Sequence, residues 1–123
     1  MAKRTALDRA EMALRGFAMT YPASTEDFPW GHRAIKVRGK LFVIFANDNG
    51  TLRVTAKLPV SNAHALALPF AEPTGYGLGK SGWVTATFGP KDTVPLEMLF
   101  EWVDESYRAV APKKLVATLQ DGG

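Results

Sequence analysis

The sequence contains no cysteine, only two histidines and no apolar run long enough to cross a membrane. The absence of cysteine excludes disulfides, thiolate nucleophiles and every cysteine-containing metal site. His32 and His64 have no second histidine at helical ligand spacing, and no serine has the G-x-S-x-G context of an activated nucleophile. We therefore predict a protein with no catalytic residues, no metal site and no cofactor.

A single domain over residues 1–123 is expected, because 123 residues with 46% hydrophobic content build one core but not two. The N-terminus runs into a charged helical segment instead of an apolar signal region. We expect a monomer in the cytoplasm with no membrane contact. A flexible tail is expected from about residue 116 to residue 123.

Two segments have the apolar spacing of amphipathic helices. The first runs from Thr5 to about Ala18, and Thr5 with Asp8 three residues later has the pattern of a capping box. The second begins near Asp92 and ends before Pro112, which cannot continue a helix.

Alternation of apolar and polar residues predicts three consecutive antiparallel strands after a proline-containing loop at 20–31. Turn residues that tolerate positive φ separate these strands. The predicted strands cover residues 32–37, 41–46 and 52–57, joined by turns at Arg38-Gly39 and 47–50.

The register of these strands predicts which residues share a face. A two-residue turn at Arg38-Gly39 places Ile35 opposite Phe42, so Ile35, Phe42 and Ile44 are expected on one face. Val54 joins that face only if the second turn is odd in length, so we predict a bulge or an odd loop within 47–51. The other face is expected to carry Lys36, Leu41, Val43, Arg53, Thr55 and Lys57.

The remaining segments complete an α+β fold. Residues 61–68 have the pattern of a short helix, 70–75 of a linker, 76–78 of a fourth strand and 83–88 of a fifth. The order α-β3-α-β2-α predicts a single antiparallel sheet with helices on one face. The second face is left to solvent or to a partner.

The glycine-rich stretch GYGLGKSGW at 75–83 has some features of a phosphate-binding loop. The spacing excludes that motif, because its first glycine would fall on Thr74, and a P-loop opens a helix. The residues after Gly82 alternate as a strand does. We predict a turn between two strands with Lys80 at its tip, where successive backbone N–H groups would hold an anion.

Positive charge is concentrated in the middle of the chain, where residues 30–88 hold seven basic residues and two acidic ones. A basic sheet face beside an aromatic residue is suited to contact phosphates and stack on bases. Charged side chains that lie in solvent and prevent the sheet from pairing with another chain have the same pattern. The residues alone leave both interpretations open, non-specific nucleic-acid binding and a solvated sheet face. The candidate nucleic-acid-binding residues are Lys36, Arg38, Lys40, Arg53, Lys57, Lys80 and Trp83.

A protein- or small-ligand-interaction module is the alternative interpretation. Its pocket is expected beside Tyr76 and Tyr107, next to Trp83. The acidic positions of the late helix are interpreted as structural or solubilising, and not as a catalytic or metal site: Glu97, Glu101 and Glu105.

Three segments resemble the MmcQ/YjbR family of small bacterial proteins. YGLGKSGWVTATF has the family's tyrosine and lysine ahead of a tryptophan strand, ESYRAVAPKKL has its S/A-Y-x-x-V-x-P-K-x-L helix end, and AIKVRGKLFVIF is similar to its early hairpin. The resemblance runs from about Leu7 to Leu115. It implies a CyaY-like, double-wing fold and a DNA-binding role. Gly77, Gly79 and Gly82 stand where the better-known branch tends to have His and Asn, which implies fewer base-reading groups.

Overall fold

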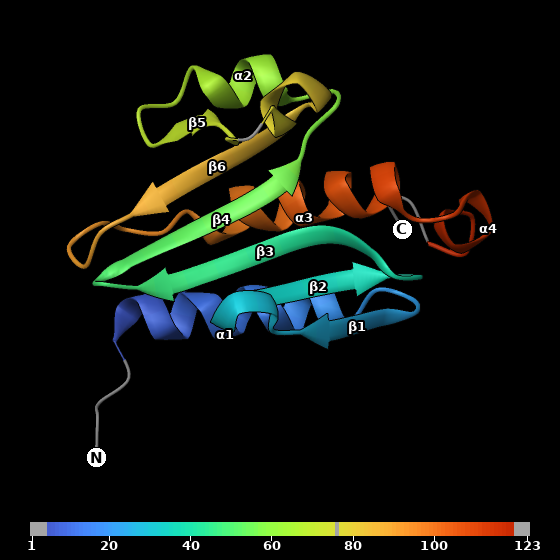
Figure 1. The fold of residues 1–123 in the computed structure, drawn as a ribbon, viewed down its shortest axis with the longest axis horizontal. Coiled ribbons are helices and arrows are strands. Elements are labelled where there is room, and N and C mark those ends of the chain that lie inside the picture. Colours follow the sequence, from blue (N-terminus) through green and yellow to red (C-terminus); the bar gives the residue numbers. More distant parts are fainter. Residues whose placement is uncertain (1–4, 76, 120–123) are drawn as a thin grey trace.

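The protein is built on one antiparallel sheet of six strands in the order β1-β2-β3-β4-β6-β5 (Figure 1). The structure is a computed structural model and describes residues 5–75 and 77–119. The strands are β1 (Ser24–Asp27), β2 (Arg33–Val37), β3 (Lys40–Asp48), β4 (Thr51–Lys57), β5 (Ala71–Pro73) and β6 (Trp83–Phe88). The helices are α1 (Ala6–Met19), α2 (Asn62–Leu66), α3 (Leu96–Val110) and α4 (Lys113–Val116), with 3-10 turns η1 (Pro29–Gly31) and η2 (Leu78–Ser81).

Helices α1 and α3 cover one face of the sheet and leave the other face open (Figure 1). The capping box of α1 is confirmed: the Asp8 N–H donates to the Thr5 hydroxyl at 3.0 Å, and the Thr5 N–H donates to the Asp8 carboxylate at 2.9 Å. The predicted α+β class is confirmed. None of the described helices has the length and apolar character that a bilayer span requires. The largest fully buried side chains between the layers include Leu14, Phe42, Phe45, Leu99 and Tyr107.

The β2–β3 hairpin turns at Arg38-Gly39 as predicted, with φ of 52° and 80° at the two residues. The predicted pairing of Ile35 with Phe42 is wrong, because a bulge shifts the register and Ile35 pairs with Val43. Phe42 is the extra residue on β3. A bulge places two successive side chains on nearly the same side, and Phe42 and Val43 are both fully buried in the core.

The bulge lies at Phe42 and not within 47–51, where we predicted a bulge or an odd loop. There, β3 and β4 pair without a register shift across Asn49-Gly50, an even turn with φ of 51° and 75°. Ile44 pairs with Thr55 and lies on the open face, whereas Val43 pairs with Ala56 and lies on the helix face. The predicted faces of Ile44 and Val43 are therefore exchanged, because the bulge falls before both residues.

Strand β1 lies within the segment expected to be a loop. It pairs antiparallel with β2 and forms one edge of the sheet. Glu26 holds it to the helix layer by accepting from Arg15 at 2.9 Å and from Arg33. Arg33 also donates to Glu11 of α1 at 2.9 Å, and Asn47 donates to Glu11 at 2.9 Å. This polar network occupies Arg33 on the helix side of the sheet.

Two further boundaries are corrected. The strand beside β6 is β5, at Ala71–Pro73, instead of 76–78; Leu78 belongs to η2, and Tyr76 lies outside the described residues. The tail starts later than residue 116, because Val116 and Leu119 pack against the core. Residues 120–123 lie outside the described residues.

Candidate nucleic-acid interface

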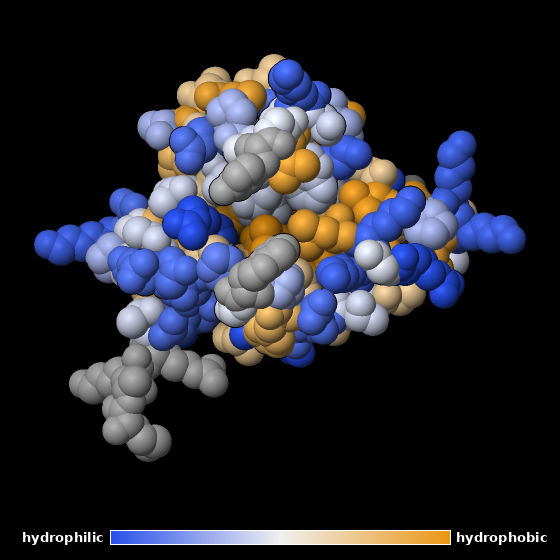
Figure 2. Space-filling model, in the orientation of Figure 1, coloured by the Kyte–Doolittle hydropathy of each residue, from blue (hydrophilic) through white to orange (hydrophobic). Residues whose placement is uncertain are grey.

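A central strip of uncharged side chains, formed by Ala34, Ile44, Thr55 and Thr85, crosses the sheet on the side away from α1 and α3; Ala34 and Thr85 are buried, and Ile44 and Thr55 are partly exposed. These four residues are cross-strand partners in one row over β2, β3, β4 and β6. Figure 2 shows this face, with apolar side chains over its middle and hydrophilic ones toward its two ends. The hydroxyls of Thr55 and Thr85 lie 2.9 Å apart and bond to each other. The central strip is therefore uncharged, and the row that contains it continues to Asp27 on β1 and Glu72 on β5.

Two of the predicted cations on this face are neutralised by acidic neighbours. Lys36 donates to Asp27 on β1 at 3.2 Å. The hydrogen bond from the Phe28 N–H is the main cause that holds the pKa of Asp27 below its ordinary value, and the hydrogen bond from Lys36 is the second cause. Arg53 lies 3.8 Å from Asp48 at the far end of the sheet, where Asp48 also contacts a histidine. These exposed pairs contribute little stability, but they cancel the local charge.

The other four predicted cations gather at one end of the sheet, which we call the basic end: Arg38, Lys40, Lys57 and Lys80. Strands β2 and β4 end here, and β3 and β6 begin here (Figure 1). Arg38, Lys40 and Lys80 are exposed and Lys57 is partly exposed. None of the four has an ion-pair partner within 5–75 and 77–119. The structure thus separates the candidate cations into a paired set and an unpaired set.

Helix α4 adds two cations that the candidate set did not contain. Lys113 and Lys114 are exposed in α4, which lies at the same end of the molecule as the β2–β3 turn (Figure 1). Burial raises the pKa of Tyr107 near the end of α3, and the charge of Arg38 acts in the opposite direction. Arg38 therefore lies near the segment that leads into α4. The P-K-K-L pattern in the sequence was the available signal for these two lysines.

Trp83 lies on the open face at the start of β6. It is partly buried and pairs across the strands with Lys57, while the next residue, Val84, points into the core. The predicted turn before it is confirmed as η2, flanked by Gly77 and Gly82 with φ of 78° and 89°. A strand and not a helix follows, as the sequence indicated.

The predicted anion site in this turn is corrected. The N–H groups of Gly79, Lys80 and Gly82 donate to backbone carbonyls of the same segment at 3.0 to 3.2 Å. These donors are therefore satisfied within the turn. Among the described residues of this turn, the exposed side chains of Lys80 and Ser81 remain to contact an anion.

The predicted pocket at Tyr76 and Tyr107 is also corrected. Tyr107 is fully buried, and its hydroxyl donates to the Pro22 carbonyl at 2.8 Å. Its ring packs against Phe42 with centroids 5.2 Å apart. Tyr107 is thus a core residue that fastens the end of α3 to the segment before β1. Tyr76 lies outside the described residues.

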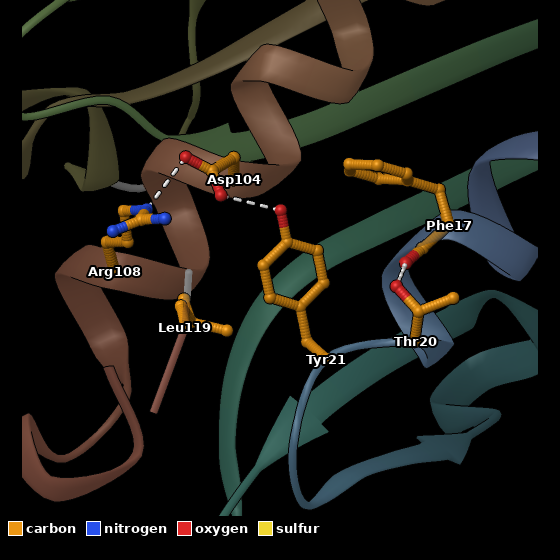
Figure 3. Close-up of a pocket in the computed structure, with 6 residues that line it drawn as sticks. All are labelled: Phe17, Thr20, Tyr21, Asp104, Arg108 and Leu119. Carbon is orange, nitrogen blue, oxygen red and sulfur yellow. Dashed lines mark hydrogen bonds and ion pairs between the residues drawn. The ribbon is translucent and has the colours of Figure 1, made fainter. Parts of the chain in front are cut away.

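A cleft of about 190 Å³ lies between the end of α1 and the second half of α3 (Figure 3). In it the Tyr21 hydroxyl donates to Asp104 at 2.6 Å, and Arg108 donates to the same carboxylate at 2.8 Å. Burial is the main cause that raises the pKa of Tyr21 well above its ordinary value, and the hydrogen bond to Asp104 raises it further. The hydroxyl of Tyr21 and the guanidinium of Arg108 thus both bond to the Asp104 carboxylate within the cleft. Its lining is Phe17, Thr20, Tyr21, Asp104, Arg108 and Leu119.

The acidic face of α3 has one member with a structural role. Glu105 accepts from the Val60 N–H at 2.8 Å, the Ser61 N–H at 3.0 Å and the Ser61 hydroxyl at 2.6 Å. It ties α3 to the start of α2, which is a structural role. Glu97 and Glu101 are exposed as expected. Among the described residues, no three His, Asp or Glu side chains are grouped closely enough to hold a metal ion.

Comparison with known proteins places this fold in a family. The chain is similar to the crystal structure of Deinococcus radiodurans protein DR2400, which carries the domain DUF419, at 29% identity and a TM-score of 0.63. That match covers 86% of this chain and 78% of the other. No curated protein matches the chain. The YjbR family model matches residues 19–109. The chain therefore belongs to the YjbR family, as its tryptophan-strand and helix-end motifs implied.

Proposed function

We propose that the protein binds nucleic acid through the phosphate backbone, at the basic end and without catalysis. The observation that carries this proposal is the unpaired state of Arg38, Lys40, Lys57 and Lys80 within the described residues. Their charges are not cancelled by acidic neighbours, unlike those of Lys36 and Arg53. An anionic polymer is the ligand that complements such a surface. We further propose that the protein acts as a monomer in the bacterial cytoplasm.

The arrangement favours binding without sequence specificity. Lysine contacts to phosphates position a protein on nucleic acid but do not read bases. The hydroxyls of Thr55 and Thr85, which lie on the central strip, bond to each other instead of pointing to a base edge. Contacts to about four to six phosphates predict a dissociation constant near ~10⁻⁵ M at physiological salt and a steep loss of affinity as salt rises.

The test is a fluorescence anisotropy titration of labelled nucleic acid with the full chain. We expect saturable binding at about 20 mM salt and a large loss of affinity at about 200 mM, because released counterions drive the association. Duplexes of unrelated sequence should bind with similar affinity. Absence of binding at the lower salt concentration would reject the proposal.

The central strip supports the second candidate, a protein or small-ligand partner on the open face. Ile44 lies on this face without a helix over it and is partly exposed. Uncharged sheet surface of this kind also receives protein partners. Co-purification with one defined partner, together with no response to nucleic acid, would favour this candidate over the first.

A further inference from the structure

Trp83 and Lys57 form an aromatic and cationic pair on the open face, and Lys80 lies in the turn that leads into β6. Trp83 and Lys57 are direct cross-strand partners, and such pairs have Cβ atoms about 5 Å apart. Lys80 is exposed three residues before Trp83, in η2, and Leu78 of the same turn is 43% exposed. Neither lysine has an ion-pair partner in the part of the chain that the structure describes.

We propose that this group binds an unpaired nucleotide, so that the preferred ligand is single-stranded nucleic acid rather than duplex. The proposal rests on the function proposed above and specifies its ligand. One base stacks on the Trp83 ring, and Lys57 and Lys80 contact the phosphates on either side of it. Stacking accepts any base, because every base has a π-face.

The uncharged surface next to Trp83 supports this choice. Thr85, which is buried, follows Trp83 on the same face of β6, and the partly exposed Thr55 and Ile44 continue the row toward β2. The bases of an unpaired strand can lie on such a surface while its backbone stays at the cationic end. In a duplex, the bases are stacked inside and present only their edges in the grooves. A flat sheet with one aromatic side chain then gains phosphate contacts alone.

Charge complementarity selects a polyanion over an apolar protein segment as the occupant. Lys57 and Lys80 have no acidic partner among the described residues, and the two acids of the central row, Asp27 and Glu72, lie at its ends on β1 and β5. A protein segment bound to the strip would leave both ammonium groups without partners. A nucleotide satisfies the ring and the ammonium groups together.

Two measurements test the proposal with the full chain. The first titrates the wild-type protein with oligothymidine of about 15 nucleotides, with a duplex of the same length and with heparin, following tryptophan fluorescence and anisotropy. We expect quenching by oligothymidine and an affinity at least about 5-fold above that for the duplex. Equal affinity for both polymers, with no quenching, would overturn the proposal while leaving phosphate binding intact.

The second measurement compares Trp83→Leu with Trp83→Phe, after circular dichroism has shown that both are folded. Loss of stacking predicts an about 10-fold weaker affinity of Trp83→Leu for oligothymidine, with duplex and heparin affinities unchanged. Trp83→Phe should retain most of the affinity. If neither oligonucleotide nor heparin binds the wild-type protein, the function proposed above fails together with this inference. A uniform loss for all three ligands would overturn the stacking role alone.

Discussion

Removal of the Ser106 hydroxyl should destabilise the fold more than any other deletion of a single oxygen in α3. Ser106 is fully buried. Its hydroxyl donates to the Phe42 carbonyl and accepts from the Lys57 N–H at 2.8 Å. The β3–β4 ladder begins only at Val43 and Ala56, because Phe42 is the extra residue of the bulge. Ser106 therefore satisfies the two backbone groups that the bulge separates.

The expected magnitude for Ser106→Ala follows from the two groups left without partners. Each buried backbone group that loses its hydrogen-bond partner lowers the free energy of unfolding by about 1–3 kcal/mol. Because Lys57 is partly exposed, water partly replaces the lost partner of its N–H, and we expect a total loss of about 2–4 kcal/mol. For a chain of this size, each kcal/mol lowers the midpoint of thermal unfolding by about 4 °C.

Urea denaturation monitored by circular dichroism measures this loss, with an unchanged m-value as the sign of two-state unfolding. Thr118→Ala is the matched control, because its hydroxyl donates to the Leu115 carbonyl at an exposed site. The control should cost less than about 1 kcal/mol. If Ser106→Ala is no more destabilising than Thr118→Ala, the role assigned to Ser106 at the bulge is refuted.

Three further changes have distinct expected outcomes. The hydrogen bond from Arg15 chiefly holds the pKa of Glu26 below its ordinary value, so ionised Glu26 stabilises the fold above its unfolded pKa of about 4.3 and this stability is lost as the pH falls through the lower folded pKa. Urea titrations from neutral pH to about pH 3 should therefore show a shallower acid loss for Glu26→Gln than for wild type; an identical slope would contradict the assignment. Gly82→Ala should cost about 1–3 kcal/mol, because φ is +89° and the new Cβ lies 3.3 Å from the Leu58 carbonyl oxygen. Gly16→Ala, inside α1 with nothing within 4 Å of the new Cβ, should instead stabilise the fold by up to about 1 kcal/mol; thermal unfolding of both variants with the same sign would contradict this account.

The sequence predicted those elements whose determinants are local. The capping residues Thr5 and Asp8 identify the start of α1, and Arg38-Gly39 identifies the hairpin turn. Apolar alternation identifies β4 and β6 in the same way, because one face of each is buried. These signals were enough to predict an α+β fold with a single antiparallel sheet.

The features that were missed depend on residues far apart in the chain. Strand β1 has no apolar alternation, and Glu26 holds it through Arg15 and Arg33. The bulge at Phe42 is supported by Ser106, which follows it by 64 residues. A run of apolar residues permits a bulge at any of several positions, so the sequence could not place this one.

The candidate site was predicted as a set of residue types, and the structure supplied the partners. Composition alone could not show which lysines form ion pairs. Lys36 pairs with Asp27, whereas Lys57 has no acidic partner among the described residues. Likewise, periodicity placed Trp83 in a strand without deciding its face. The register of β4 and β6 decides it and brings Trp83 beside Lys57.

The most direct test of the proposed function is the slope of log Kd against log salt concentration for nucleic acid, measured on charge variants. The double variant Lys57→Ala/Lys80→Ala removes two cations of the basic end, and Lys91→Ala removes an exposed lysine after β6, at the opposite end of the sheet. We predict a slope of magnitude about 4 for wild type, a value lower by about 2 for the double variant, and no change for Lys91→Ala. Equal slopes for the double variant and Lys91→Ala would contradict binding at the basic end.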